Sequence, residues 1–224
     1  MGYEMRDLNQ QIIKFDYEQN FKDDDFYVSK SNKLVFDLLM NWPNWQKKFL
    51  NISGERSSGK THLMNIFKKK FRGYKIDANS LNNDDLKEIK IHENIILENL
   101  NKNSDEKLIN SLFNLIDQDN KYLIITSPKP IVNIEFDLKD LRSRSKDFIL
   151  QNIEKPDDEL MFALILKNLS DRQIAVEEKL IKYIIKRIDR SYGKIFEFIY
   201  KIDELSLKRK KSIDFKIIKE VLGE

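Results

Sequence analysis

Through the first two thirds of the chain, hydrophobic positions alternate between two patterns. Short continuous apolar runs are typical of buried parallel strands, whereas apolar residues that recur every three or four positions predict amphipathic helices. Strands that alternate with helices predict an α/β fold with a parallel sheet and right-handed crossovers. The expected strands are residues 49–52, 74–77, 95–97, 122–126 and 148–150. A first helix is expected to begin near Ser31, with Leu34, Val35, Leu38 and Leu39 on one face. Two further helices are expected at 63–71 and 105–117.

After Pro156 the apolar spacing is helical only. We therefore expect three parts: a flexible N-terminal arm at residues 1–25, an α/β domain at 26–154 and a C-terminal helical lid domain at 155–224. Ser212 is a suitable N-cap for the last helix, and Gly223 is a suitable stop. The expected lid helices are residues 160–169, 180–188, 195–205 and 215–222.

Composition narrows the class of protein. The 224 residues are 41% hydrophobic, enough for a real core, and their charges nearly cancel to a net +3. That balance argues against binding nucleic acid by charge alone, so we expect no direct DNA binding. The chain has no cysteine, which fits a reducing cytoplasm, and no apolar run approaches the roughly 20 residues that cross a bilayer. We expect a soluble, cytoplasmic protein with no membrane partner.

The residues after the first expected strand match the phosphate-binding (Walker A) pattern G-x-x-x-x-G-K-[ST] in full, with a strand before it and a helix after it. The glycines let backbone N–H groups surround phosphate oxygens, and the helix adds its positive end. Lys60 would neutralise the terminal phosphates, and the Thr61 hydroxyl would ligate Mg²⁺. The sequence therefore predicts that ATP or ADP binds at Gly54, Glu55, Arg56, Ser57, Ser58, Gly59, Lys60, Thr61 and the adjoining His62.

A second acidic motif follows the third expected strand. Glu98 stands where a phosphate-loop hydrolase holds its metal-associated acid, and Asn99 stands where a base is expected. An amide orients a water molecule but accepts no proton at neutral pH, so we infer weak intrinsic hydrolysis. The functional interpretation makes Glu98 a catalytic acid and Mg²⁺ ligand, and the alternative makes it a polar strand-end residue.

Several segments together resemble the AAA+ ATPases of the DnaA/Hda family. They are the aromatic-Val run followed by Ser-Asn at 26–32, the Gly-Lys-Thr-His-Leu sequence at 59–63, the strand and Lys-Pro at 122–130, the Leu-x-Ser-Arg sequence at 141–144 and the final helix at 213–222. The resemblance covers nearly the whole chain from Phe26. It implies an AAA+ phosphate-loop core with a parallel sheet, followed by an α-helical lid.

The resemblance also implies roles for particular residues. Tyr27, Val28 and Asn32 would lie on the adenine side of the nucleotide. Arg144 would act as an arginine finger in trans, reaching the nucleotide of a neighbouring protomer and stabilising charge on the departing γ-phosphate. The alternative for Arg144 is a surface arginine paired with Asp140 or Asp147.

Two positions depart from the family pattern. Pro128 replaces the nucleotide-sensing Asp after Thr-Ser, and Gly193 stands at the sensor arginine of the lid. Arg190 or Lys194 would supply the missing charge. Together with Asn99, these departures argue against autonomous ATP hydrolysis.

The N-terminal arm offers a partner site. Gln10, Ile13 and Phe15 have the spacing of a peptide that docks in the hydrophobic pocket of the DNA polymerase III sliding clamp (β subunit), although such residues are as often a plain tail. The chain ends at Glu224, and we expect no helix-turn-helix domain after the lid. We therefore expect a clamp-associated regulator of chromosomal replication initiation that stimulates ATP hydrolysis by the initiator DnaA.

Two other classes stay open. One is a DnaA-type or helicase-loader-type ATPase that acts directly in replication initiation. The other is a nucleic-acid-binding module that uses the basic runs at 68–70 and 208–211, which are more often solvated helix faces. The sequence also leaves open whether ATP or ADP is resident and whether the protein forms a homodimer.

Overall fold

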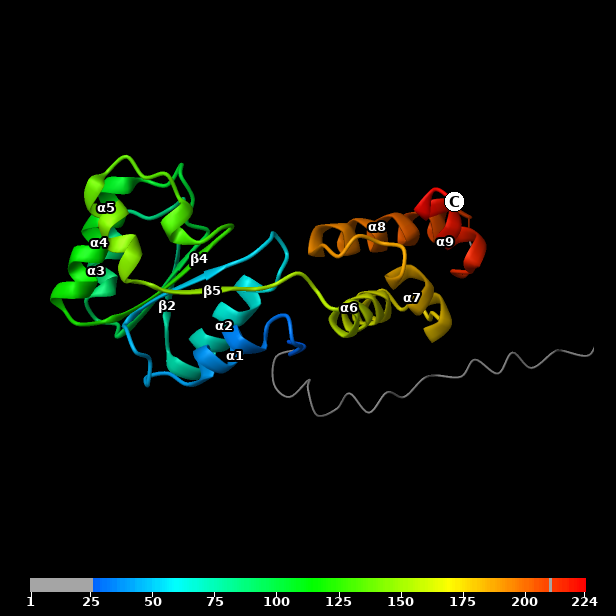
Figure 1. The fold of residues 1–224 in the computed structure, drawn as a ribbon, viewed down its shortest axis with the longest axis horizontal. Coiled ribbons are helices and arrows are strands. Elements are labelled where there is room, and N and C mark those ends of the chain that lie inside the picture. Colours follow the sequence, from blue (N-terminus) through cyan, green and yellow to red (C-terminus); the bar gives the residue numbers. More distant parts are fainter. Residues whose placement is uncertain (1–25, 210) are drawn as a thin grey trace, which may run out of the picture.

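The computed structural model describes residues 26–209 and 211–224, so the arm and its predicted clamp-binding residues Gln10, Ile13 and Phe15 lie outside the described residues. A parallel sheet with the order β2-β3-β4-β1-β5 forms the centre of the larger part (Figure 1). Its strands are β1 (Phe49–Ser53), β2 (Tyr74–Asp77), β3 (Asn94–Glu98), β4 (Tyr122–Ser127) and β5 (Ile149–Asn152). The predicted α/β class and all five predicted strands are confirmed.

Helices cover both faces of the sheet because every central strand carries apolar side chains on both sides. Helices α1 (Lys33–Met40) and α2 (Lys60–Phe71) pack with one core cluster. The second core cluster contains residues of three helices, α3 (Asn83–Ile89), α4 (Glu106–Gln118) and α5 (Lys139–Arg144). Two short 3-10 turns, η2 (Ile131–Asn133) and η3 (Ser145–Asp147), lie in the same part of the chain. The sequence patterns did not predict α3 or α5, since each is short and contributes one buried residue, Ile89 and Leu141 respectively.

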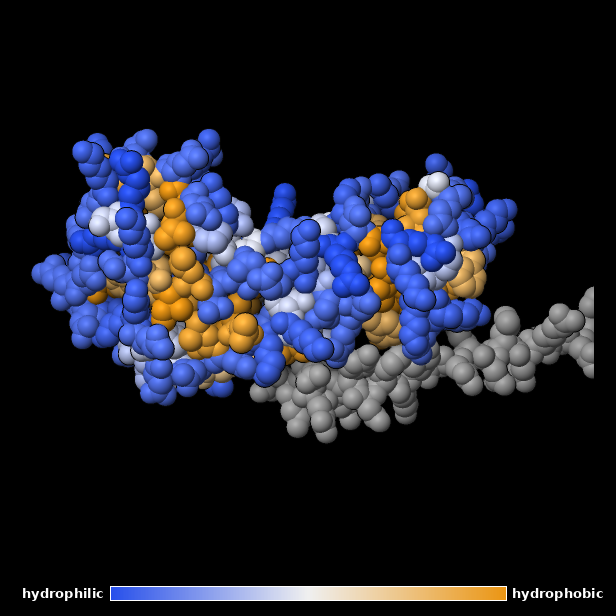
Figure 2. Space-filling model, viewed as in Figure 1, coloured by the Kyte–Doolittle hydropathy of each residue, from blue (hydrophilic) through white to orange (hydrophobic). Residues whose placement is uncertain are grey.

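The C-terminal part is helical, as predicted, and lies at one end of the molecule (Figure 1). It has a core of its own, built from the inward faces of its helices. In Figure 2, apolar atoms on the visible face gather in two areas, one over the α/β part and one among the lid helices. The lid helices are α6 (Asp158–Asp171), α7 (Glu178–Ile185), α8 (Tyr192–Arg209) and α9 (Phe215–Leu222).

Local details differ from expectation at two helices. In α1 the buried residues are Val35 and Leu39, whereas Leu34 is 74% exposed, so the predicted apolar face was too wide. The N-cap of α9 is Asp214, whose side chain accepts from Ile217 N–H at 2.9 Å, and the prediction of Ser212 was wrong. A carboxylate at that position also interacts favourably with the helix dipole. Gly223 does end the helix, in the left-handed conformation.

The register of the sheet brings polar residues at the strand ends together. Ser53 at the end of β1 lies opposite Ser127 of β4 and Asn152 of β5, and Asp77 of β2 lies opposite Glu98 of β3. Because all strands are parallel, their carboxyl ends meet at one edge of the sheet. Ligands of open α/β sheets bind at this edge.

Candidate functional site

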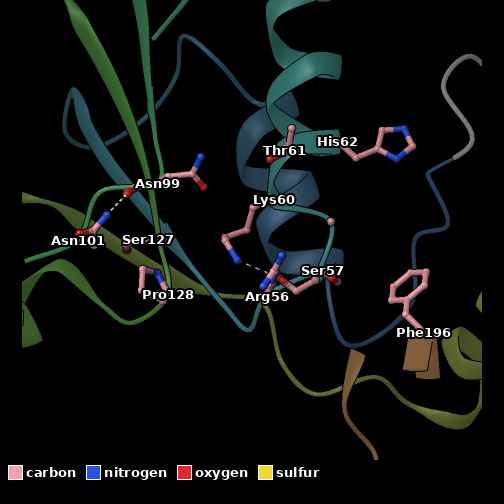
Figure 3. Close-up of a pocket in the computed structure, with 12 residues that line it drawn as sticks. Arg56, Ser57, Lys60, Thr61, His62, Asn99, Asn101, Ser127, Pro128 and Phe196 are labelled. Carbon is pink, nitrogen blue, oxygen red and sulfur yellow. Dashed lines mark hydrogen bonds between the residues drawn. The ribbon is translucent and has the colours of Figure 1, made fainter. Parts of the chain in front are cut away.

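The predicted phosphate-binding loop connects β1 to α2 at the carboxyl edge of the sheet. It borders a cavity of about 640 Å³. Figure 3 shows the loop between the strand-end residues of β3 and β4 on one side and Phe196 of α8 on the other. The described residues that line the cavity are Arg56, Ser57, Ser58, Gly59, Lys60, Thr61, His62, Asn99, Asn101, Ser127, Pro128 and Phe196.

The two glycines of the loop are required for different reasons. A Cβ on Gly54 would lie 2.8 Å from Ser58 Oγ and 3.2 Å from Ile153 Cβ, so a side chain there would require Ser58 and Ile153 to shift. Gly59 has φ +89°, a conformation that other residues rarely adopt, and its Cβ would lie 3.0 Å from the Phe26 ring. The close turn allows the first N–H groups of α2 to face the cavity, which is the arrangement that binds anions.

Lys60 lies at the centre of the loop. Its ammonium donates to the Gly54 carbonyl at 2.7 Å and to the Glu55 carbonyl at 2.8 Å. Burial lowers the pKa of Lys60, and the nearby Glu55 carboxylate acts in the opposite direction. A half-buried cation beside a helix N-terminus can pair with a phosphate group at little further desolvation cost.

Glu98 lies at the end of β3 and is only 6% exposed. Its Oε2 pairs with Lys75 Nζ of β2 at 2.9 Å, and Lys75 also donates to Asn65 of α2 at 2.8 Å. The other oxygen, Oε1, is buried with no hydrogen-bond partner. Glu98 does not itself line the cavity, although the adjacent Asn99 does.

The donor set only partly fits Mg²⁺, which requires anionic or neutral oxygens in a near-octahedral shell. Thr61 lines the cavity at the start of α2 and fits this role. The carboxylate of Glu98 is already neutralised by an ammonium group. Within the described ranges, no group of three or more His, Cys, Asp or Glu side chains is arranged to hold a metal ion.

Asn99 forms a contact that the sequence did not reveal. The residue has φ +61°, and its amide donates to the carboxylate of Asp77 at the end of β2. Burial acts to raise the pKa of Asp77, but the hydrogen bonds from Asn99 and Asn79 outweigh it and hold the pKa below its usual value. Asp77 is therefore a carboxylate close to the predicted position of the base. Its signal in the sequence was its place at a strand end.

The turn after β4 brings Ser127 and Pro128 to the cavity. The buried side chain of Asn51 in β1 holds this turn: its amide donates to Ser127 Oγ at 2.8 Å, and its oxygen accepts from Ile131 N–H at 2.8 Å. Sequence reasoning missed Asn51, although a lone asparagine inside an apolar strand signals a buried hydrogen-bond role.

The predicted adenine-side residues lie beside the loop and organise their own segment. Asn32 is buried, accepts from Ser29 N–H at 2.9 Å and donates to the Tyr27 carbonyl at 2.9 Å. The Tyr27 hydroxyl donates to Glu159 of α6. Val28, the next residue along the chain, is half-buried. Tyr27, Val28 and Asn32 are not among the residues that line the cavity. The loop residue His62 does line it and packs edge-on against Phe26 at 5.5 Å between ring centroids.

The charged lid residues do not line the cavity. Arg190 pairs with Asp158 at 2.7 Å, and Lys194 pairs with Glu197 at 2.9 Å. Phe196 of α8 is the lid residue that lines it.

The loop itself also contacts the lid through Glu55. Its carboxylate accepts from the Gly193 N–H at 3.1 Å, from the Tyr192 N–H at 3.3 Å and from the Ser191 hydroxyl. Burial acts to raise the pKa of Glu55, but these three hydrogen bonds outweigh it and the pKa lies below its usual value.

Arg144, the predicted arginine finger, ends α5 and is not among the cavity residues. Its guanidinium donates to Asp117 and to Asn114 of α4, each at 2.7 Å, and pairs with Asp140 at 3.2 Å. Of the two carboxylates considered as alternative partners, Asp140 is the one in contact. The side chain is 24% exposed.

The strand order, the glycine-containing loop after β1 and the helical C-terminal part are those of the AAA+ fold. Residues 157–222 match the family description "Hda, lid domain". The chain is 26% identical over 227 residues to the chromosomal replication initiator protein DnaA of Thermoanaerobacter sp. (strain X514), which covers 90% of this chain and 51% of that protein. It is 24% identical to an uncharacterised protein of Haemophilus influenzae, covering 89% of this chain and 92% of that one.

Solved structures agree on the fold. Domain III of DnaA from Thermotoga maritima aligns with a TM-score of 0.68 at 18% identity, covering 89% of this chain and 94% of that chain. AMPPCP-bound DnaA from Aquifex aeolicus aligns with a TM-score of 0.65 at 20% identity, covering 83% and 66%. This chain is similar to AAA+ proteins of the DnaA/Hda type, and it spans about half the length of the curated DnaA relatives that it matches. No described helix is both long and apolar enough to cross a membrane.

Proposed function

We propose that this protein binds adenine nucleotide in the cavity beside residues 54–61 and regulates replication initiation by acting on DnaA. The loop geometry carries the proposal: a left-handed Gly59, the N-terminus of α2 and the Lys60 ammonium meet at the edge of the sheet where ligands bind. Bound AMPPCP in the A. aeolicus relative supports an adenine nucleotide as the ligand. Thr61 would contribute a ligand to Mg²⁺.

The nucleotide in this site serves as a structural ligand that is hydrolysed slowly. Asn99 cannot act as a base, and Lys75 neutralises the carboxylate at the position of the metal-associated acid. The match to the Hda lid supports a regulator within this family. The protein would act in the cytoplasm and would dock on the sliding clamp through Gln10, Ile13 and Phe15.

Calorimetry with ADP and ATP tests the binding site. Lys60→Ala removes the ammonium group that would pair with phosphate, so affinity falls by about tenfold to a hundredfold. Lys87→Ala is the matched control because Lys87 is exposed on α3 and pairs only locally, with Asp84. Equal nucleotide affinity in the parent and Lys60→Ala proteins, with both folded, would refute the proposed site.

The action on DnaA requires Arg144 to leave its contacts with α4 and reach the partner's nucleotide. ATP hydrolysis by DnaA is measured with and without this protein and a DNA-loaded clamp. Arg144→Ala should abolish the stimulation, for which arginine fingers supply on the order of 10³-fold or more. Arg142→Ala is the control, because Arg142 is an exposed arginine two residues earlier on the same helix.

Two results would contradict this function. Full stimulation by Arg144→Ala would exclude the finger. ATP turnover by the purified protein alone at about one per second or faster would instead indicate a working ATPase.

A further inference from the structure

Hydrogen bonds connect Glu55 of the loop after β1 with the start of the lid helix α8. Glu55, the second residue of the phosphate-binding loop, accepts from Ser191, Tyr192 and Gly193 at the start of α8. The first four N–H groups of an α-helix have no partner within the helix, and the helix dipole places partial positive charge there. The Glu55 carboxylate supplies both the missing acceptor and the complementary charge.

Glycine at position 193 is matched to this contact. A Cβ built on Gly193 would lie 3.3 Å from Glu55 Oε1, so a side chain there would require the carboxylate to shift by a few tenths of an ångström. The family resemblance described above implies a sensor arginine at this position, where the chain has glycine. The lack of a side chain at position 193 therefore leaves room for the Glu55 carboxylate at the N-terminus of α8.

We propose that Glu55 is a positioning residue that fastens the first turn of α8, and with it Phe196, against the candidate nucleotide cavity. It thereby links lid and loop directly within the chain. The inference deepens the proposed function, since it rests on the cavity being the nucleotide site.

The same residue connects the lid to the loop lysine. Lys60 Nζ contacts the Glu55 carbonyl at 2.8 Å while the Glu55 side chain contacts α8. A phosphate that draws the ammonium toward the cavity acts on the residue that holds the lid. Nucleotide release and lid position are therefore coupled through Glu55.

The experiment measures the distance between core and lid. The chain has no cysteine, so Lys87→Cys on α3 and Tyr200→Cys on α8 provide two specific labelling sites on exposed positions. Distance distributions between spin labels are recorded for the otherwise unchanged protein and for Glu55→Ala, Glu55→Gln and the control Glu204→Ala. Glu204 is exposed on the same helix. ADP dissociation rates are measured on the same proteins.

The expected result is a broader or shifted distance distribution in Glu55→Ala and ADP release about tenfold faster, as the loss of charge-assisted hydrogen bonds implies. Glu55→Gln keeps an acceptor oxygen and should lie between the parent and the alanine variant. Gly193→Ala should act in the same direction, and its effect should not add to that of Glu55→Ala, because both variants remove one contact.

An unchanged distance distribution in Glu55→Ala would overturn the proposal, and so would an effect of Gly193→Ala that adds fully to it. The distance measurement needs no nucleotide. If the parent protein binds no ADP, the proposed function fails, while the distance distributions still decide whether Glu55 holds the lid.

Discussion

The side chain of Asn51 allows a quantitative test of how the sheet positions the cavity. Asn51 is fully buried in β1. Its amide donates to the Ile125 carbonyl at 3.2 Å and to Ser127 Oγ at 2.8 Å, and its oxygen accepts from Ile131 N–H at 2.8 Å. Asn51→Leu preserves the approximate size of the side chain but removes all three hydrogen bonds.

The cost follows from what each partner retains. Ser127 Oγ still donates to the Lys129 carbonyl at 2.7 Å, so this hydroxyl keeps a partner. The Ile131 N–H loses its acceptor at a residue that is fully buried. A buried donor left without a partner costs about 1–3 kcal/mol, and each other lost hydrogen bond costs about 1 kcal/mol. The more apolar leucine side chain offsets part of this cost. The free energy of unfolding should therefore fall by about 2–4 kcal/mol. This is a large share of the roughly 5–15 kcal/mol that stabilises a typical domain.

Urea unfolding followed by circular dichroism measures this loss, with Asn44→Leu, an exposed asparagine, as the matched control. Nucleotide affinity should fall as well, because the turn held by Asn51 carries Ser127 and Pro128 to the cavity. A free energy of unfolding within about 0.5 kcal/mol of the parent protein, the range typical of surface substitutions, would refute the reasoning.

Two further predictions concern charged groups. Lys75→Met removes the ammonium that neutralises Glu98, so nucleotide binding should depend more strongly on Mg²⁺. Calorimetry measures the nucleotide affinity with Mg²⁺ and with EDTA. The same ratio of these two affinities in the parent and variant proteins would contradict the prediction. Burial acts to raise the pKa of Asp157, but hydrogen bonds from Leu160 and Ser31 hold it below its usual 3.8. A lowered pKa contributes stability that is present above that usual value and is lost as pH falls through the folded-state pKa. Ser31→Ala should therefore move acid unfolding, followed by circular dichroism, to higher pH; an unmoved midpoint would show that this contact contributes nothing.

Local patterns in the sequence were sufficient for much of the fold. The run Ile95-Ile96-Leu97 predicted a buried strand because a strand covered on both faces has no polar side. The position of the loop from Gly54 to Thr61 could be predicted for a similar reason, since the spacing of its residues is set by the backbone turn before α2. The short helices α3 and α5 were not predicted, because a few residues provide too little periodicity to distinguish a helix from a loop.

The sequence by itself determined the parallel sheet, the glycine-containing loop at its edge and the helical C-terminal part, since each depends on residues close together in the chain. Only the tertiary structure decided the partners of the charged groups: Lys75 with Glu98, Arg144 with Asp117, and Glu55 with the start of α8. These pairs join residues 23, 27 and 138 positions apart in sequence. The physical reason is that a charged side chain pairs with whichever group folding brings within a few ångströms, and that neighbour depends on strand order and on where the lid packs.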